Sequence, residues 1–382
     1  MRQHKRVLLA VGIAALVAGG CGSSSKSEDT TAAGTAASTA AADAGSADVS
    51  AAKAAVAPYV GQASPAFPVD TPLKAKPAAD LKISQLQYGT PYGALFASLV
   101  DQAGKTAGID VHATKVGNTA SGVQAAAESV LSYDPKAMIL SAAEPSTISK
   151  QLQEMKDRGI KVFSAGVMDP QKWGIAGSQL QDEQVKLVGK LLADWAVAEH
   201  GDDTNAVFYE LTELSFNAPE KQAFVDEMQR ICPKCTVRTV PMSVTEVGTK
   251  VPNNVVSDLQ TNADTNVAVF AGSDSIVGVP AALKSAGIDV SIIGFAGDPT
   301  TFQYIKDGSV DAVLAISPAV QSWTLMDMAL RSAQGQELTA GEQKGITPMQ
   351  FLTQKDITFD PSKGWASDPD FVQTFSDLWH VG

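Results

Sequence analysis

The chain has 382 residues, with 29 Lys and Arg against 41 Asp and Glu, and so carries a formal net charge of −12. This acidic balance, with no basic cluster after the first residues, disfavours nucleic acid and anionic membrane surfaces as partners. No stretch after Asp80 approaches the roughly 20 apolar residues that a membrane-spanning helix needs.

Residues 1–20 have the parts of a secretory signal peptide: a short basic head, an apolar run over residues 7–18 and small residues before Cys21. The small residues resemble a bacterial lipobox, although Ala18 stands where that motif usually has Leu. Cleavage there would leave Cys21 as a lipidated N-terminus, anchored to the membrane without spanning it. The alternative is a chance cysteine beside an ordinary signal peptide or a membrane anchor. We predict lipidation at Cys21 and a location on the extracytoplasmic side of the cell membrane.

Residues 21–79 consist largely of Ala, Ser, Thr, Asp and Gly, with prolines gathered toward the end. Such a segment buries too little apolar surface to offset the entropy that is lost on ordering. The composition therefore predicts a disordered tether ahead of the folded part.

From residue 80 onward, short β-rich runs alternate with amphipathic helical runs, which is typical of parallel sheets covered by helices on both faces. About 300 folded residues exceed what one core usually covers, so two lobes are expected. We predict an α/β fold of two Rossmann-like lobes with parallel sheets joined by a hinge, the first from residues 80–176 with 319–347 and the second from 177–318 with 348–382. The expected strands are residues 81–87, 110–116, 137–142 and 161–165 in one series, and 205–211, 236–241, 266–272, 290–297 and 311–317 in the other.

Cys232 and Cys235 form a C-x-x-C pair in "RICPKCTVR". A zinc site would need a second pair of ligands, and a thioredoxin-like motif would begin a helix after a strand. This pair instead follows an expected helix and precedes an expected strand. In an oxidising compartment, a structural disulfide between Cys232 and Cys235 is the favoured interpretation.

Three stretches carry a resemblance to a known family: "QLQYGTPYG" from residue 85, "NVAVFAGSDS" from residue 266 and "VSIIGFAGDP" from residue 290. Their order and spacing resemble the type I periplasmic binding proteins, especially the ribose/galactose-type branch that serves ABC importers. The resemblance extends from residue 81 to about residue 335. LacI-type repressors share the lobe fold but begin with a helix-turn-helix, where this chain has the expected signal peptide.

The resemblance implies a monomeric receptor that captures a small solute in a cleft, closes about a hinge and delivers the solute to an ABC permease. It implies no cofactor, no metal and no catalysis. A sensor module that feeds a chemoreceptor or kinase is the alternative, and an extracellular enzyme on the same scaffold is a third. The sequence has no nucleophile elbow, phosphate-binding loop or His cluster to support catalysis.

The expected ligand site lies beyond the carboxyl ends of the strands, where open α/β sheets bind their ligands. Asn217 is equally consistent with a helix N-cap, and Tyr92 could instead pack inside the first helix. Asp274 is expected to cap the following helix rather than touch the ligand. The candidate ligand-binding residues are Tyr88, Thr90, Tyr92, Gly166, Asn217, Ser273, Asp298, Gln321 and Trp323.

Several positions depart from the pattern of the sugar-binding family. Ala165 and Gly166 stand where that family commonly has an Asp-Arg pair, Asn217 lies where it often has an Arg, and Ala296 replaces its usual Asp. Because buried polar groups must be satisfied, a pentose site needs several charge-assisted hydrogen bonds. We infer a less polar site with walls from Tyr88 and Tyr92, with Trp173 or Trp323 as further candidates. Such a site suits a modified sugar, a glycoside or a small aromatic solute.

Overall fold

Two β-sheets organise the chain in a computed structural model that describes residues 45–64, 67–116, 119–141 and 144–382. The described residues belong to one compact unit. The expected signal peptide and lipidated Cys21 lie outside the described residues. None of the described helices is both long and apolar enough to cross a bilayer.

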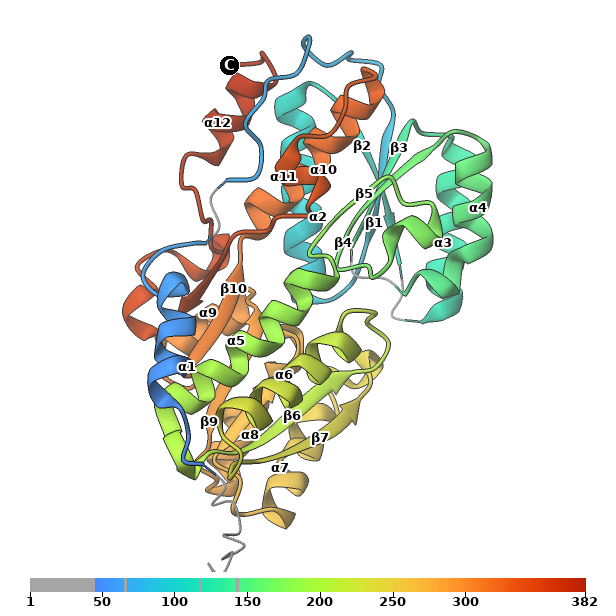
Figure 1. Cartoon of the computed structure of the whole chain (residues 1–382). Helices are drawn as coiled ribbons and strands as arrows, with labels where there is room; N and C mark the ends of the chain where they lie inside the picture. Colours follow the sequence, from blue (N-terminus) through green and yellow to red (C-terminus); the bar gives the residue numbers. More distant parts are fainter. Residues whose placement is uncertain (1–44, 65–66, 117–118, 142–143) are drawn as a thin grey trace, which may run out of the picture. The chain divides into compact units, whose positions relative to one another are not determined.

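The first lobe is built on a five-stranded sheet in the order β2-β1-β3-β4-β5, with every pair parallel (Figure 1). Helices α2 and α10 pack on one face of this sheet and α3 and α4 on the other. The strands are β1 (Ile83–Gln87), β2 (Val111–Lys115), β3 (Ala137–Ser141), β4 (Lys161–Ala165) and β5 (Gly177–Gln179). The helices are α2 (Pro91–Ala107), α3 (Ala120–Tyr133), α4 (Ser149–Asp157) and α10 (Pro318–Ala333).

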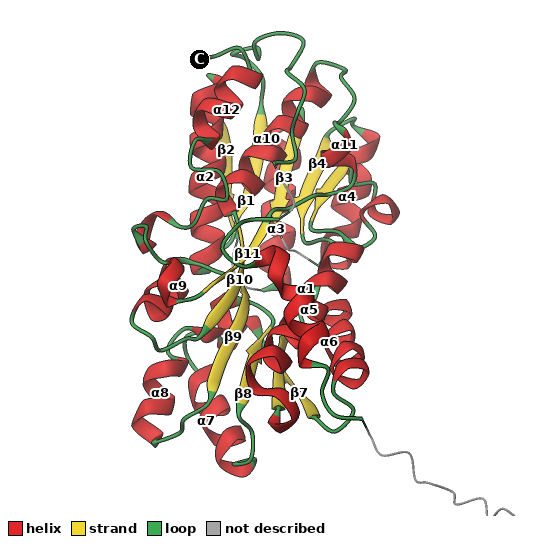
Figure 2. Cartoon of the chain, turned by 60° about the vertical axis from the view of Figure 1, so that its left-hand side comes forward, coloured by secondary structure: helices red, strands yellow, loops and turns green. Residues whose placement is uncertain are grey.

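The second lobe is built on a six-stranded sheet in the order β11-β10-β9-β8-β6-β7, in which only β11 is antiparallel. Helices α5 and α6 cover one face, and α7, α8 and α9 cover the other (Figure 2). The strands are β6 (Asn205–Leu211), β7 (Thr236–Met242), β8 (Val267–Phe270), β9 (Ser291–Ala296), β10 (Ala312–Ile316) and β11 (Met349–Leu352). The helices are α5 (Asp182–His200), α6 (Asn217–Ile231), α7 (Val251–Thr261), α8 (Val279–Ala286) and α9 (Pro299–Lys306).

All nine strands expected from the sequence are present, and the α/β class with two parallel-dominated sheets is confirmed. β5 and β11 were not expected, because three and four residues are too short to show a clear apolar pattern. β5 lies in the first sheet, so residues 177–179 belong to the first lobe and not to the second as the sequence predicts. Directly after β5, the Leu180 backbone N–H donates to the carbonyl oxygen of Gly345 at 3.0 Å, and α5 then begins the second lobe.

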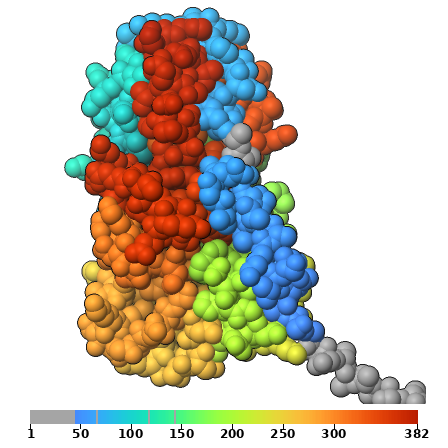
Figure 3. Space-filling model, turned by 90° about the vertical axis from the view of Figure 1, so that its left-hand side faces the viewer, coloured from blue at the N-terminus to red at the C-terminus, as the bar shows by residue number. Residues whose placement is uncertain are grey.

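The expected tether over residues 21–79 is wrong for its described part, because residues 45–64 and 67–79 pack along the fold (Figure 3). Helix α1 (Val49–Val56) places Ala52 and Val56 in the core beside α5 and α6, and Asp48 caps its N-terminus. Farther on, Val69 and Leu73 join the core of the first lobe. The few apolar residues that are buried in this segment pack on the two lobes, which supply partners that composition alone does not reveal.

The C-terminal residues divide between the lobes. β11 joins the second sheet, but helix α12 (Phe371–Leu378) packs on α10 in the first lobe, so residues 348–382 do not all belong to the second lobe. Trp379 follows α12 and stacks on Trp323, with ring centroids 5.3 Å apart. Its indole N–H donates to Asp327 at 2.7 Å, and the same carboxylate pairs with the fully buried Arg331. This buried charged cluster fixes the C-terminus on the first lobe.

Cys232 and Cys235 form the expected disulfide, with their Cα atoms 5.3 Å apart. The bond closes the turn between α6 and β7. Its place after a helix and before a strand agrees with a structural role.

Candidate functional site

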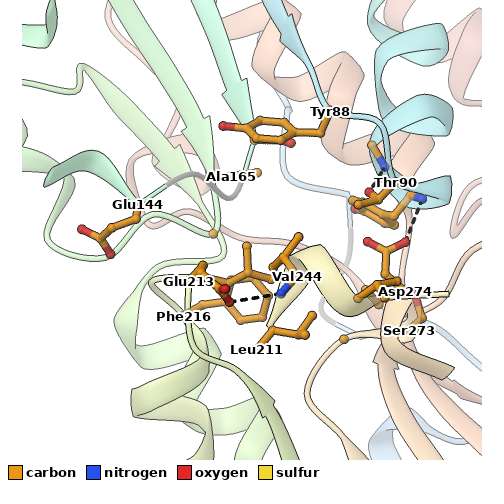
Figure 4. Close-up of a pocket in the computed structure, with 18 of the residues that line it drawn as sticks. Tyr88, Thr90, Glu144, Ala165, Leu211, Glu213, Phe216, Val244, Ser273 and Asp274 are labelled. Atoms are coloured by element: carbon orange, nitrogen blue, oxygen red, sulfur yellow. Dashed lines mark hydrogen bonds between the residues drawn. The ribbon is translucent and has the colours of Figure 1, made fainter. Parts of the chain in front are cut away.

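A cavity of about 310 Å³ lies where the carboxyl ends of strands from both sheets face one another (Figure 4). The first lobe contributes residues after β1, β3 and β4, and the second contributes residues after β6, β8 and β9. The cavity is lined by Tyr88, Thr90, Tyr92, Gly93, Thr119, Ala120, Val123, Ser141, Glu144, Thr147, Ala165, Gly166, Leu180, Leu211, Glu213, Leu214, Phe216, Val244, Val247, Gly272, Ser273, Asp274, Phe295, Ala296, Ile316 and Gln321.

The turn after β1 places Tyr88 and Thr90 at the cavity. The Thr90 hydroxyl accepts from the backbone N–H of Gly93 at 3.1 Å and so caps α2, with Pro91 in the first turn. A Cβ at Gly93 would lie 2.8 Å from the Cβ of Tyr88, so only glycine allows the helix to approach this closely. The Tyr88 hydroxyl is buried and has no hydrogen-bond partner among the described residues, and burial raises the pKa of this phenol.

Tyr92 lies at the start of α2 and lines the cavity, so its side chain is not packed solely against its own helix. Its hydroxyl donates to Oε1 of Gln321 at 2.8 Å, which fixes the ring between α2 and α10. Burial, with the nearby Asp274 carboxylate, raises the pKa of the Tyr92 phenol above its usual range. Tyr92 is therefore a neutral aromatic wall with a fixed orientation.

Hydrogen bonds between described residues join the lobes beside the cavity. The backbone N–H of Tyr92 donates to Oδ1 of Asp274 at 3.1 Å, and the Ser215 hydroxyl donates to the carbonyl oxygen of Gly166 at 3.0 Å. The expectation that Asp274 caps the following helix is wrong, because its carboxylate faces α2 of the other lobe. Burial, with the nearby Asp298 carboxylate, raises the pKa of Asp274 to about 6.

Three of the lining residues are carboxylates, and none of the described lining residues is Lys, Arg or His. Glu144 accepts from the backbone N–H of Ser146 at 3.2 Å. Glu213 accepts from the Ser243 hydroxyl and from the Val244 backbone N–H, the latter at 3.1 Å. These donors are neutral, so they leave the negative charges of Glu144 and Glu213 uncompensated. The described residues contain no group of three or more His, Cys, Asp and Glu placed to hold a metal ion.

Six of the nine candidate ligand-binding residues meet at the cavity, and three lie elsewhere. Asn217 is buried in α6, where its side-chain oxygen accepts from the backbone N–H of Leu211, so it neither caps the helix nor lines the cavity. Asp298 caps α9 and accepts from the backbone N–H groups of two threonines. Trp323 faces the opposite side of α10, against α12. Trp173 also lies outside the cavity, packed at the edge of the first-lobe core.

Phe216 and Phe295 supply aromatic surface that the sequence did not indicate. Phe295 lies in β9 and has the apolar neighbours of an ordinary core residue. The backbone at the cavity also has a feature that is evident only in the structure: Ala296 and Leu180 have φ values of +80° and +52°. Such left-handed conformations are uncommon for residues other than glycine and gather at functional sites, but a sequence does not display them.

The fold and the position of the cavity define a two-lobed binding protein of the periplasmic binding protein type I fold. A family model described as "Periplasmic binding protein domain" matches residues 83–337. The chain belongs to this family. No protein with a curated description matches the sequence significantly.

Several solved structures share the fold at low identity. An ABC transporter periplasmic solute-binding protein from Actinobacillus succinogenes 130z, with bound D-allose, is 16% identical with a TM-score of 0.63, over 73% of this chain and 99% of that one. The arabinose-transporter binding protein of Shewanella sp. ANA-3, bound to L-arabinofuranose, is 17% identical with a TM-score of 0.63, over 78% and 98%. A putative LacI transcriptional regulator from Bacteroides fragilis is 14% identical with a TM-score of 0.64, over 72% and 98%.

Proposed function

We propose that the protein is an extracytoplasmic solute-binding lipoprotein of an ABC importer. It captures a small solute in the cavity between its lobes, and closure about the hinge buries the solute and presents the closed form to a permease. Cys21 anchors the mature chain to the outer side of the cell membrane. Membership of the periplasmic binding protein family supports this proposal.

The observation that carries the proposal is the cavity itself. Its walls come from both lobes, and Asp274 and Ser215 of the second lobe reach backbone groups of the first at its edge. A solute that contacts both walls binds the closed form better than the open form, so it shifts the population toward closure. This is the physical requirement for a receptor that signals its loaded state by its shape.

The lining favours a solute that is less polar than a free pentose. Neutral aliphatic and aromatic side chains form most of the wall, and the described lining residues do not include the charged pairs expected of a sugar site. A modified sugar, a glycoside or a small aromatic solute meets this surface with fewer unsatisfied polar groups.

A thermal-shift screen over sugars, polyols, nucleosides and aromatic solutes tests the proposal, because a ligand stabilises by RT ln(1 + [L]/Kd). Small-angle X-ray scattering then measures whether a stabilising solute makes the protein more compact. Ala120→Trp would narrow the cavity from the exposed start of α3 and should abolish both responses. Ala281→Trp, on an exposed helical position away from the cavity, is the matched control. Binding that is unaffected by Ala120→Trp, or binding without compaction, contradicts the proposal.

The anchor has its own test. Radiolabelled palmitate should enter the protein in bacterial cells, and Cys21→Ser should abolish the labelling. Labelling that persists in this variant refutes lipidation at Cys21 without affecting the proposal for the cavity.

A further inference from the structure

The charge of the cavity restricts the solute further than its polarity does. Glu144 comes from the first lobe, Glu213 and Asp274 come from the second, and no cationic side chain is among the described lining residues. An anionic solute entering this space would meet like charges in a partly desolvated site, where electrostatic repulsion is stronger than in water. The cavity therefore disfavours carboxylates and phosphates.

Outside the cavity, none of the residues that the structure describes forms an ion pair with Glu144 or Glu213. Glu213 is held by a hydroxyl and a backbone N–H of residues 243–244, and Glu144 by the backbone N–H of Ser146. These contacts orient both carboxylates without compensating their charge. In contrast, Glu210 and Glu227 of the same lobe pair with Lys221 and Arg230. Among the described residues, Glu144 and Glu213 thus face the cavity without a Lys or Arg partner.

Aromatic faces accompany the negative charge. Figure 4 shows Tyr88 on one wall and Phe216, beside Glu213, on the opposite wall. Aromatic faces attract cations through the ring quadrupole, more strongly where the cation is desolvated. Tyr92 and Phe295 add two further rings to the lining. A cation with an apolar body would match both features of the wall.

Polar groups without partners remain for the solute. Ser273 lines the cavity, is only 1% exposed, and its hydroxyl has no hydrogen-bond partner among the described residues. The buried hydroxyl of Tyr88 is in the same condition. Each hydroxyl can accept a hydrogen bond from an ammonium N–H or bond a hydroxyl of the solute.

We propose that the solute is a small organic cation, with an amine or quaternary ammonium group on an apolar or aromatic body. The inference rests on the proposed solute-binding function. A cation would also favour closure, because it lies between acids contributed by different lobes and offsets the repulsion between them. The ligand then contacts both lobes electrostatically only in the closed form.

Probes of similar shape that differ mainly in charge test this inference. The first set is 2-phenylethylamine, neutral 2-phenylethanol and anionic 3-phenylpropionate, and the second is choline with its neutral carbon analogue 3,3-dimethyl-1-butanol. Calorimetric titration should show at least one cation binding about tenfold or more tightly than its neutral analogue. The anion should not bind measurably, and raising the salt concentration should weaken binding of the cation more than that of the neutral probe.

Glu213→Gln and Glu144→Gln should each reduce the preference for the cation over its neutral analogue by severalfold. Both carboxylates lie at exposed or half-buried positions, so folding should persist, as circular dichroism can verify. Glu337→Gln, at an exposed position that does not line the cavity, should leave the preference unchanged.

The inference is overturned if neither cation binds more tightly than its neutral analogue, or if the glutamine variants keep the full preference. Scattering separates this failure from failure of the proposed function. If a neutral or anionic solute compacts the protein while the cations do not, the receptor function stands and the charge assignment falls. If no solute, cationic or otherwise, compacts it, both fall.

Discussion

The backbone N–H of Tyr92 in the first lobe donates to the carboxylate of Asp274 in the second lobe at 3.1 Å. The side chain of Tyr92 is fixed at the same time by its hydrogen bond to Gln321. Tyr92, which forms part of the aromatic wall, is therefore also one of the residues that join the lobes. The cavity wall and the contact between the lobes share one position on α2.

Replacing Asp274 with Ala should weaken solute binding. The change removes the acceptor for the Tyr92 N–H and with it a hydrogen bond to a charged group, which contributes about 1.5–3 kcal/mol. We expect a loss of affinity of about tenfold to a hundredfold, measured by calorimetry, and less compaction by scattering. Asp274→Asn keeps a carbonyl acceptor and should lose less. Equal affinities for wild type and Asp274→Ala would show that this contact does not support closure.

Asp274 should also make stability depend on pH. Its pKa in the folded protein, about 6, lies above the usual 3.8, so the folded state binds the proton more tightly than the unfolded chain. The stabilisation by this proton is complete below pH 4 and is lost as the pH rises through 6. Asp274→Asn removes the ionisable group, so it should be more stable than wild type at pH 8, by on the order of 1–3 kcal/mol, and nearly equal near pH 4. Denaturant unfolding at both pH values measures this difference, and a constant difference would contradict the assignment.

Substitutions can separate the contributions of the hydroxyl and of the ring of Tyr92 to solute binding. Tyr92→Phe removes the hydroxyl bonded to Gln321 but keeps the ring, so we expect a loss of affinity of about threefold to tenfold. Tyr92→Ala also removes the aromatic wall and should lose considerably more. Solute titrations of both variants, with stability checked by thermal unfolding, measure the difference. If Tyr92→Ala binds as well as Tyr92→Phe, the ring does not contact the solute.

The sequence was informative where the chemistry is local. Strands buried on both faces are continuously apolar, so nine of them could be located, and six of the nine candidates chosen from the segments that follow them line the cavity. The candidates that lie outside the cavity show that the direction of a side chain does not follow from its position along the chain. Asn217 and Asp298 also lie near strand ends, but each side chain bonds to nearby backbone, and the direction of one side chain decides the outcome. Phe295 is the opposite case: it lines the cavity but was not a candidate, because an apolar strand residue gives no sign in the sequence that it lies at a cavity.

The backbone strain at Ala296 gives a prediction about stability. Its φ of +80° is disfavoured for a residue with a Cβ, so Ala296→Gly should relieve roughly 1–2 kcal/mol of strain and lose less than that in chain entropy. We expect equal or slightly higher stability in urea unfolding. Ala271→Gly is the control, because Ala271 is fully buried and does not have a positive φ, so it should be destabilised. Similar losses in both variants would contradict the assigned strain.

The N-terminal segment offers the sharpest test of where along the chain the folded part begins. Two valines four residues apart have opposite environments. Val56 is 7% exposed and packs in the core beside α5 and α6, whereas Val60 is 42% exposed. Val56→Ala removes buried methyl groups and should lower the free energy of unfolding by about 1–3 kcal/mol, while Val60→Ala should change it by less than about 0.5 kcal/mol. Urea unfolding of the two variants measures both values. Equal, negligible effects would instead support the disordered tether that the composition predicts, because a segment that does not pack on the lobes cannot contribute to their stability.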